Sequence, residues 1–367
     1  MRLLISFLLL LTAFSIDSDY VSAKAVDRSV FYTYQQMKDE LQQYELRYPN
    51  FISVQELAQT QGGRCVILLE IGKKTVEHVK PGMLAIFGQH ADEHETTKMA
   101  MGFVKRLIEA YGTDAELTNL LDTSIVYIVP MANPDGSDYD MGSDKIFTTW
   151  RKNRMPTSEN NYGVDLNRNW DYCWATPTTT DLDRMINDPE NEYYHGKNPF
   201  SEVETKSISD FVLSHRSQIQ LFLDYHTGWA GFMQGDVLIP YCYTEEQKLS
   251  PNVWTKSETV GSNLCRLLSD DKDKRKAYAI MQAYEVRKYV LEAAPFWQRP
   301  IIKSSLPAST LAPGAAIDWV ASQGIMSFGI EADCSNGRVE KDAVSREQMI
   351  QHQYKGFLYL LGHLAKE

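Results

Sequence analysis

The chain has 367 residues, of which 43% are hydrophobic and 23% charged, so disordered, collagen-like and coiled-coil proteins are excluded. Its 37 Lys and Arg against 48 Asp and Glu give a formal charge of -11, which argues against nucleic acid or an anionic membrane as the main partner. We therefore expect a folded protein with a sizeable core that does not act on nucleic acid.

A long apolar run lies close to the N-terminus. Leu3 to Phe14 follows Met1-Arg2 and is short for a membrane span, while Val21-Ser22-Ala23 offers a small-residue cleavage site. We expect residues 1–23 to be a signal peptide that exports the chain to the periplasm or outside the cell, with no stable membrane insertion after cleavage. A retained membrane anchor is the alternative. Residues 24–367 would then form one domain.

Apolar spacing predicts alternating helices and strands along this domain. In chain order they are a helix over Tyr32–Tyr48, a strand over Met83–Phe87, a helix over Thr96–Tyr111, a strand over Ser124–Val129, a helix over Glu202–Leu213, and strands over Ile219–Tyr225 and Ile325–Ile330. This alternation is typical of the α/β class, with a mixed or largely parallel sheet covered by helices on both faces.

Polar residues follow each predicted strand. His90 and Glu93 come after the first strand, Asn133-Pro134-Asp135-Gly136 after the second and His226 after the third, while Glu331 closes the fourth. Ligands of open α/β sheets bind beyond the carboxyl ends of the strands. Four such strand ends therefore predict one shared site.

The segment Gln89 to Glu95 holds two imidazoles and three carboxylates. Zinc uses such nitrogen and oxygen ligands, and His226 is the obvious third ligand beside His90 and Glu93. Two alternatives remain at this point. His90 and His94 stand four apart and could form a helical pair, and a solvated acidic helix start would look similar.

Several motifs in a fixed order favour the zinc site over these two alternatives. After HxxE the chain reads NPDG, WRKxR (Trp150–Arg154), GVDxNRNW (Gly163–Trp170), YHG, a lone His after an apolar strand, IDW (Ile317–Trp319) and a late Glu. In this order the motifs resemble the zinc metallocarboxypeptidases of the pancreatic carboxypeptidase A and B type, from about Phe31 to the C-terminus. In that family an inhibitory pro-domain can precede the catalytic domain, and we expect none here.

The resemblance implies one zinc ion per chain, held by His90, Glu93 and His226. Glu331 matches the general base, which takes a proton from water and returns it to the leaving amine. Asp165 corresponds to the carboxylate that accepts the remaining N–H of the first zinc histidine. Glu95 is the nearest other carboxylate that could serve as base.

The resemblance also implies a set of substrate contacts. Arg154 matches the oxyanion stabiliser, Asn167 and Arg168 match the pair that grips a terminal carboxylate, and Arg151 would be an auxiliary contact. Ile317 matches the residue in the side-chain pocket, where an apolar group favours apolar C-terminal residues. Alternatively Ile317 belongs to the core, and the segment from 243 to 303 sets the pocket.

One departure from the family concerns a tyrosine. Thr310 stands where the family has a mobile active-site tyrosine, and Tyr278, Tyr284 or Tyr289 could replace it.

The five cysteines allow two disulfides at most, and their pairing cannot be read from spacing.

The leading hypothesis is an exported, monomeric zinc exopeptidase that removes C-terminal residues from peptides or proteins, with a preference for apolar residues. Two alternatives stay open: a carboxypeptidase acting on peptidoglycan peptides, and a weakened or non-catalytic peptide-binding homologue.

Overall fold

The computed structural model describes residues 28–74, 79–142, 149–172, 174–175, 180–227, 237–238, 313–332 and 343–364. Across these ranges the centre of the molecule is a seven-stranded sheet in the order β1-β2-β4-β3-β5-β7-β6. The strands are β1 (Ile52–Gln59), β2 (Cys65–Ile71), β3 (Gly82–Phe87), β4 (Ile125–Val129), β5 (Ile219–Thr227), β6 (Val237–Leu238) and β7 (Met326–Ala332).

The middle of the sheet is parallel. β3 lies between β4 and β5 and runs parallel to both, and β5 runs parallel to β7. The outer pairs, β1 with β2, β2 with β4 and β6 with β7, are antiparallel. The carboxyl ends of β3, β5 and β7 therefore meet at one edge, where the sequence predicts the shared site.

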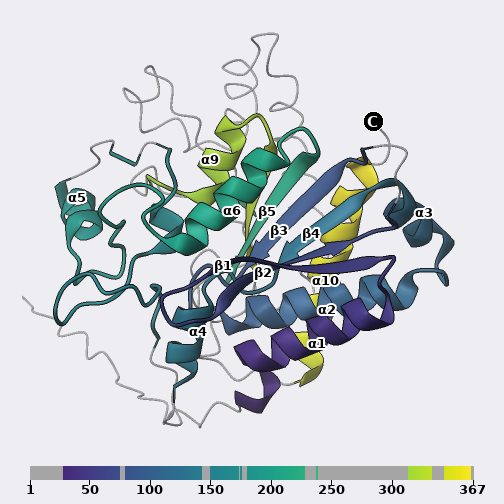
Figure 1. Ribbon diagram of the computed structural model, residues 1–367, viewed down its shortest axis with the longest axis horizontal. Coiled ribbons are helices and arrows are strands. Elements are labelled where there is room, and N and C mark those ends of the chain that lie inside the picture. Colours follow the sequence, from purple (N-terminus) through teal and green to yellow (C-terminus); the bar gives the residue numbers. More distant parts are fainter. Residues whose placement is uncertain are drawn as a thin grey trace, which may run out of the picture.

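Helices cover both faces of the sheet (Figure 1). In the described residues they are α1 (Tyr34–Arg47), α2 (His94–Ala110), α3 (Ala115–Thr123), α4 (Pro134–Met141), α5 (Thr180–Asn187), α6 (Val203–Ser214), α9 (Ala316–Ser322) and α10 (Ala343–Leu364). One buried cluster joins α1, α2 and α10 to one face, and a second joins α6 and α9 to the other. The side chains of β3 alternate between the two clusters. Met83 and Phe87 belong to the first cluster, and Leu84 and Ile86 belong to the second.

The α/β class and the two covered faces are confirmed, and the seven predicted elements are present with ends that shift by no more than two residues. The hairpin of β1 and β2 was not predicted. β1 is only partly buried, so its apolar alternation is weak, although Gly62-Gly63 marks the turn between the strands. α10 was also missed, although Met349, Ile350, Phe357, Leu360 and Leu361 repeat at helical spacing on its buried side.

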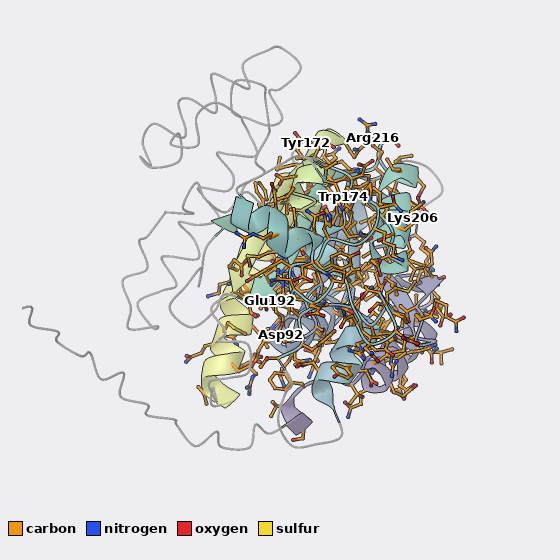
Figure 2. All side chains as sticks on the ribbon, turned by 90° about the vertical axis from the view of Figure 1, so that its left-hand side faces the viewer. Asp92, Tyr172, Trp174, Glu192, Lys206 and Arg216 are labelled. Atoms are coloured by element: carbon orange, nitrogen blue, oxygen red, sulfur yellow. The ribbon has the colours of Figure 1, made fainter. Side chains whose placement is uncertain are left out.

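Between α4 and α6 the described part of the chain is mostly irregular. Its buried Asn169 donates through Nδ2 to the carbonyls of His195 and Asn198 at 2.9 and 3.0 Å. Trp174, labelled in Figure 2, belongs to the same segment, and its ring stacks on that of His195 with centroids 4.0 Å apart. These contacts hold irregular chain firmly enough to carry functional side chains. Within the described residues no helix has the length and apolar character needed to cross a membrane.

Candidate metal centre and active site

His90 and Glu93 lie in the loop between β3 and α2. Gly88 begins this loop with a φ of +62°, a left-handed conformation that glycine adopts without strain. The Thr96 hydroxyl closes the loop, because it accepts from the Gly88 amide at 2.9 Å and donates to the Glu93 carbonyl at 2.7 Å. The loop is thus fixed at both ends, and with it the directions of the two side chains.

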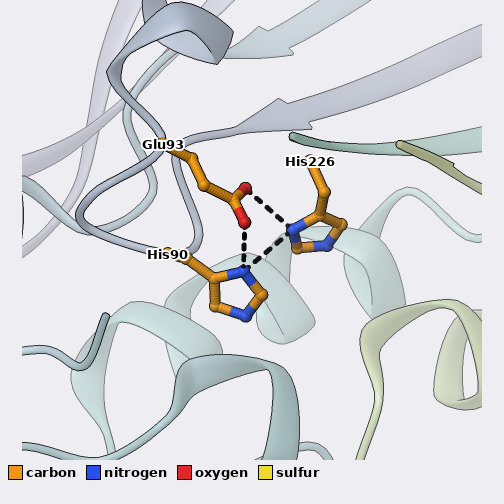
Figure 3. Close-up of side chains that lie close together, drawn as sticks. All are labelled: His90, Glu93 and His226. Carbon is orange, nitrogen blue, oxygen red and sulfur yellow. Dashed lines mark hydrogen bonds and ion pairs between the residues drawn. The ribbon is translucent and has the colours of Figure 1, made fainter. Parts of the chain in front are cut away.

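His90, Glu93 and His226 converge at the carboxyl ends of β3 and β5 (Figure 3). His90 Nδ1 lies 2.8 Å from Glu93 Oε1, and His226 Nδ1 lies 3.1 Å from both Glu93 Oε2 and His90 Nδ1. One ligand atom from each residue falls within 4.8 Å of the others, and all three side chains are buried. Two imidazole nitrogens and a carboxylate facing one point are the His₂Glu donor set that zinc prefers at open sites, so these residues fit the metal.

The ionisable groups of this cluster shift one another's pKa values. Burial alone would lower the pKa of His226, but the Asp224 and Glu93 carboxylates raise it well above its ordinary value. Burial likewise opposes ionisation of Glu93, yet His90 and His226 hold its pKa far below the ordinary value. Glu93 is therefore a carboxylate at neutral pH, ready to bind a cation.

A second carboxylate stands behind His90. Asp165 Oδ1 lies 3.3 Å from His90 Nε2, and Asp165 Oδ2 accepts from Arg151 Nε at 2.9 Å. Burial favours the neutral acid, but Arg151 and Arg168 hold the pKa of Asp165 well below its ordinary value. The sequence-predicted residues Asp165 and Arg151 thus lie together, next to the first histidine.

Glu331 lies beside the triad because of strand register. It is paired with His226 across β5 and β7, so the two side chains leave neighbouring strands on the same face of the sheet. Burial raises the pKa of the Glu331 carboxyl to about 7, although the nearby His226 lowers it. A carboxylate with a pKa near neutrality is suited to general base catalysis.

Asn167 and Arg168 lie in a short helical turn, Leu166–Arg168, on the other side of His226. Asn167 Nδ2 lies 3.1 Å from His226 Nε2, and its Oδ1 accepts from the Ala316 amide at 2.9 Å. Arg168 Nε is buried and finds no acceptor among the described residues. A buried guanidinium with a free donor fits an anionic group of a ligand.

Arg154 and Ile317 are placed differently. The Arg154 guanidinium carbon lies 3.7 Å from the ring centroid of Tyr139, 4.7 Å from that of Trp150 and 4.6 Å from that of Tyr162. Ile317 is 9% exposed and packs in the buried cluster of α6 and α9. Thr310 and the tyrosines at 278, 284 and 289 lie outside the described residues.

His94 and Glu95, the other candidate residues of the segment Gln89 to Glu95, contact other parts of the structure. His94 Nε2 lies 2.8 Å from Asp140 Oδ2, and its Nδ1 lies 3.3 Å from the Ser137 hydroxyl. Glu95 Oε1 accepts from Arg346 Nε at 2.7 Å, in a pair that is buried on both sides. His94 and Glu95 thus have partners outside the triad.

Sequence reasoning missed three residues near the centre. Asp224 and Gln89 contact each other behind His226, with Gln89 Nε2 donating to Asp224 Oδ2 at 2.9 Å. Tyr193 lies near two cations, its ring centroid 5.3 Å from the Arg151 guanidinium carbon and 5.8 Å from that of Arg168. Strand period could have identified Asp224, because residues two apart on a strand share a face.

The chain belongs to the zinc carboxypeptidase family, whose family model matches residues 37–355. Carboxypeptidase A1 of Mus musculus is 28% identical over 313 residues, which cover 85% of this chain and 64% of that protein. A zinc carboxypeptidase of Saccharothrix mutabilis subsp. capreolus is 34% identical over 146 residues, which cover 40% of this chain and 33% of that protein. The chain thus matches less than two thirds of the length of these two relatives.

Solved structures share the architecture. Thrombin activatable fibrinolysis inhibitor aligns over 96% of this chain and 79% of its own, with a TM-score of 0.70 and 23% identity. Carboxypeptidase A from Helicoverpa armigera aligns over 91% of this chain and 73% of its own, with a TM-score of 0.66 and 20% identity. At these identities the likeness shows a common fold, which agrees with the sheet order and helix layers described above.

Proposed function

We propose that the protein is a zinc-dependent carboxypeptidase that hydrolyses the C-terminal peptide bond of peptides or proteins. The observation that carries this proposal is the convergence of three groups at one sheet edge. These are the buried His90, Glu93 and His226 triad, the Glu331 carboxyl in register with His226, and the Arg168 guanidinium with its free Nε donor. A metal site, a base and an anion-binding cation together fit cleavage next to a free carboxylate.

The triad would hold one zinc ion through His90 Nδ1, His226 Nδ1 and the Glu93 carboxylate. When bound, zinc supplies Lewis-acid chemistry to water and to the scissile carbonyl. Glu331 takes the proton from the attacking water and delivers it to the leaving nitrogen. We expect His226→Ala to lose bound zinc and activity together.

The substrate carboxylate is assigned to Arg168 and Asn167. The Asn167 amide lies 3.1 Å from the His226 ring, so a carboxylate bound there is next to the metal position. Arg151, assigned as an auxiliary substrate contact, pairs with Asp165 next to His90. We assign oxyanion stabilisation to Arg154, whose guanidinium is held by three aromatic rings in the structure.

The test of the activity uses matched peptides with free and amidated C-termini, assayed with the zinc-loaded protein and after chelation. Free peptides should release their last residue, amidated ones should be resistant, and chelation should abolish turnover until zinc is restored. Efficient cleavage of amidated peptides would contradict an exopeptidase. Stoichiometric zinc with no turnover of ordinary peptides would favour the binding homologue, and release of amino acids from muropeptides alone would favour the peptidoglycan enzyme.

We further propose a preference for apolar C-terminal residues. Ile317 offers no charge to compensate the desolvation of a buried ammonium or guanidinium. Values of kcat/KM for peptides ending in Phe, Leu, Arg and Lys measure this directly. Faster cleavage after Arg or Lys would assign the pocket to other residues, the segment from 243 to 303 being the first to examine.

Export is proposed from the N-terminal sequence alone. The apolar run Leu3 to Phe14 and the small residues at 21–23 support cleavage of a signal peptide after Ala23. Expression of the full chain with mass analysis of the product should give a protein that begins at Lys24 outside the cytoplasm. A full-length product in the membrane fraction would indicate the retained anchor.

A further inference from the structure

Behind His226 lies a buried chain of hydrogen bonds. Asp224 Oδ2 is 2.8 Å from His226 Nε2 and also accepts from Gln89 Nε2 at 2.9 Å. Gln89 Oε1 in turn accepts from the Trp170 indole at 2.8 Å. Asp224 and Gln89 are 1% exposed, Trp170 is 0% and His226 is 2%, so water does not compete for these contacts.

The donor and acceptor atoms of these side chains fix the direction of the hydrogen bonds. An indole nitrogen can only donate, so the Gln89 carbonyl oxygen must face Trp170 and the Gln89 amide nitrogen must face Asp224. Asp224 is then held as an acceptor for His226. The Asn167 amide nitrogen also lies 3.1 Å from His226 Nε2, but it is a donor too, so the Nε2 hydrogen is directed to the carboxylate. In the neutral imidazole that a metal requires, the lone pair would therefore be on Nδ1, which faces Glu93 and His90.

The charge of Asp224 is not balanced by a permanent cation. Asp165, the carboxylate behind His90, pairs with Arg151. Within the described part of the chain, the ion pair of Asp224 is with His226, no lysine or arginine pairs with it, and its Oδ1 is buried without a partner. A buried carboxylate in this position favours positive charge at the neighbouring site.

We propose that Asp224 is a positioning residue for the metal centre, which holds His226 by Nε2 so that Nδ1 faces the metal and whose uncompensated charge raises the affinity for a divalent cation. This inference rests on the zinc site of the proposed function. Carboxylates that accept the second N–H of a metal-bound histidine change metal affinity about 10- to 100-fold when removed. Asp224 has this role for His226, while Gln89 and Trp170 fix the orientation of the Asp224 carboxylate.

The test measures zinc affinity of the metal-free protein by competition with a chromogenic chelator, and coordination geometry by the visible spectrum of the cobalt-substituted protein. Asp224→Asn keeps the shape and an acceptor but removes the charge, whereas Asp224→Ala removes both. We expect at least a roughly tenfold loss of zinc affinity in Asp224→Asn and a larger loss in Asp224→Ala. The cobalt spectrum of Asp224→Ala should also change, because His226 loses its fixed orientation.

Asp210→Asn is the matched control, since it makes the same charge change at an exposed carboxylate on α6 and should leave zinc affinity and the cobalt spectrum unchanged. Wild-type affinity and spectrum in both Asp224 variants would overturn the inference and leave the proposed function intact. A wild-type protein that binds no zinc would overturn both. Should Asp224→Ala not fold, as judged by near-ultraviolet circular dichroism, Asp224→Asn decides the result alone.

Discussion

Glu331 shows how a single side chain acquires its chemistry from its neighbours. Its position beside His226 follows from the register of two parallel strands, and burial raises its pKa to about 7. A bound divalent cation would favour the carboxylate form and bring this pKa down again. As the proposed general base, Glu331 would thus be a proton acceptor whose strength depends on occupancy of the adjacent metal site.

The first prediction concerns Glu331→Gln, which keeps the size of the side chain and removes its basic oxygen. We expect kcat to fall about 100-fold or more, the usual effect of losing a general base, with zinc content unchanged. Steady-state kinetics and metal analysis of the same preparation measure the two quantities. Near-normal turnover would assign the base to another carboxylate, and the pairing of Glu95 with Arg346 argues against that residue.

We expect Glu331 also to determine the pH dependence of the wild-type enzyme. Because Glu331 must be deprotonated to accept a proton, kcat/KM should rise with pH along an acid limb. The metal charge lowers the pKa, so the midpoint of this limb should lie below the value of about 7 to which burial raises the pKa of this carboxyl. Residual activity of Glu331→Gln should lack the limb.

At the scale of elements, the start of α2 is fixed directly after the candidate ligand Glu93. His94 contacts Asp140 on α4, and Glu95 pairs with Arg346 on α10. Both contacts are buried, so they hold the first turn of the helix against two other helices. The loop between β3 and α2, which carries His90 and Glu93, is thereby attached to parts of the chain far away in sequence.

The second prediction tests this anchor. Arg346→Met should lower the free energy of unfolding by about 3–5 kcal/mol, because it leaves the Glu95 charge buried and unpaired. Adding Glu95→Gln to this variant should recover part of the loss, since the uncompensated charge is removed. Urea unfolding measures all three proteins.

The control for this pair is Lys206→Met on α6 (Figure 2). Lys206 and Asp210 form an ion pair whose side chains are 53% and 56% exposed, so its loss should cost less than about 1 kcal/mol. Equal effects of Arg346→Met and Lys206→Met would mean that the Glu95 pair does not anchor the helix.

At the scale of the whole molecule, stability depends on buried acids away from the metal. Glu204, in the first turn of α6, is 3% exposed, and Asn153 Nδ2 lies 3.3 Å from each of its carboxyl oxygens. Burial raises the pKa of Glu204 from an ordinary 4.5 to about 8, and burial also raises that of Glu202. The folded state therefore keeps protons that the unfolded state has already released.

The third prediction follows from this difference. A raised carboxyl pKa contributes stability that is complete below about pH 4.5 and is lost as pH rises through about 8. Glu204→Gln should flatten the fall of the urea midpoint between these pH values and make the variant more stable than wild type at pH 8.5. Glu190→Gln, at an exposed position, is the control and should follow the wild-type curve. A wild-type midpoint that rises over this range would contradict the assignment.

Much of this architecture can be predicted from sequence because the central strands and helices are long and strongly patterned. The triad is predictable too, since its residues stand at strand ends in a recognisable order. The residues that contact the triad are harder to predict from sequence. Asp224 carries no motif, and the contact of Gln89 with Trp170 depends on an irregular segment that no periodicity describes. The positions of Arg154 and Tyr193 likewise result from packing of loop residues.

The separation of the candidate metal ligands along the chain has a kinetic consequence. His90 and His226 are 136 positions apart, and they meet only after β3 and β5 have paired. Such non-local pairing is slow and is completed late in folding. A cation that requires all three ligands therefore stabilises the finished structure more than the transition state that precedes it. Zinc should accordingly prolong the lifetime of the folded chain by slowing unfolding, while leaving the rate of folding nearly unchanged.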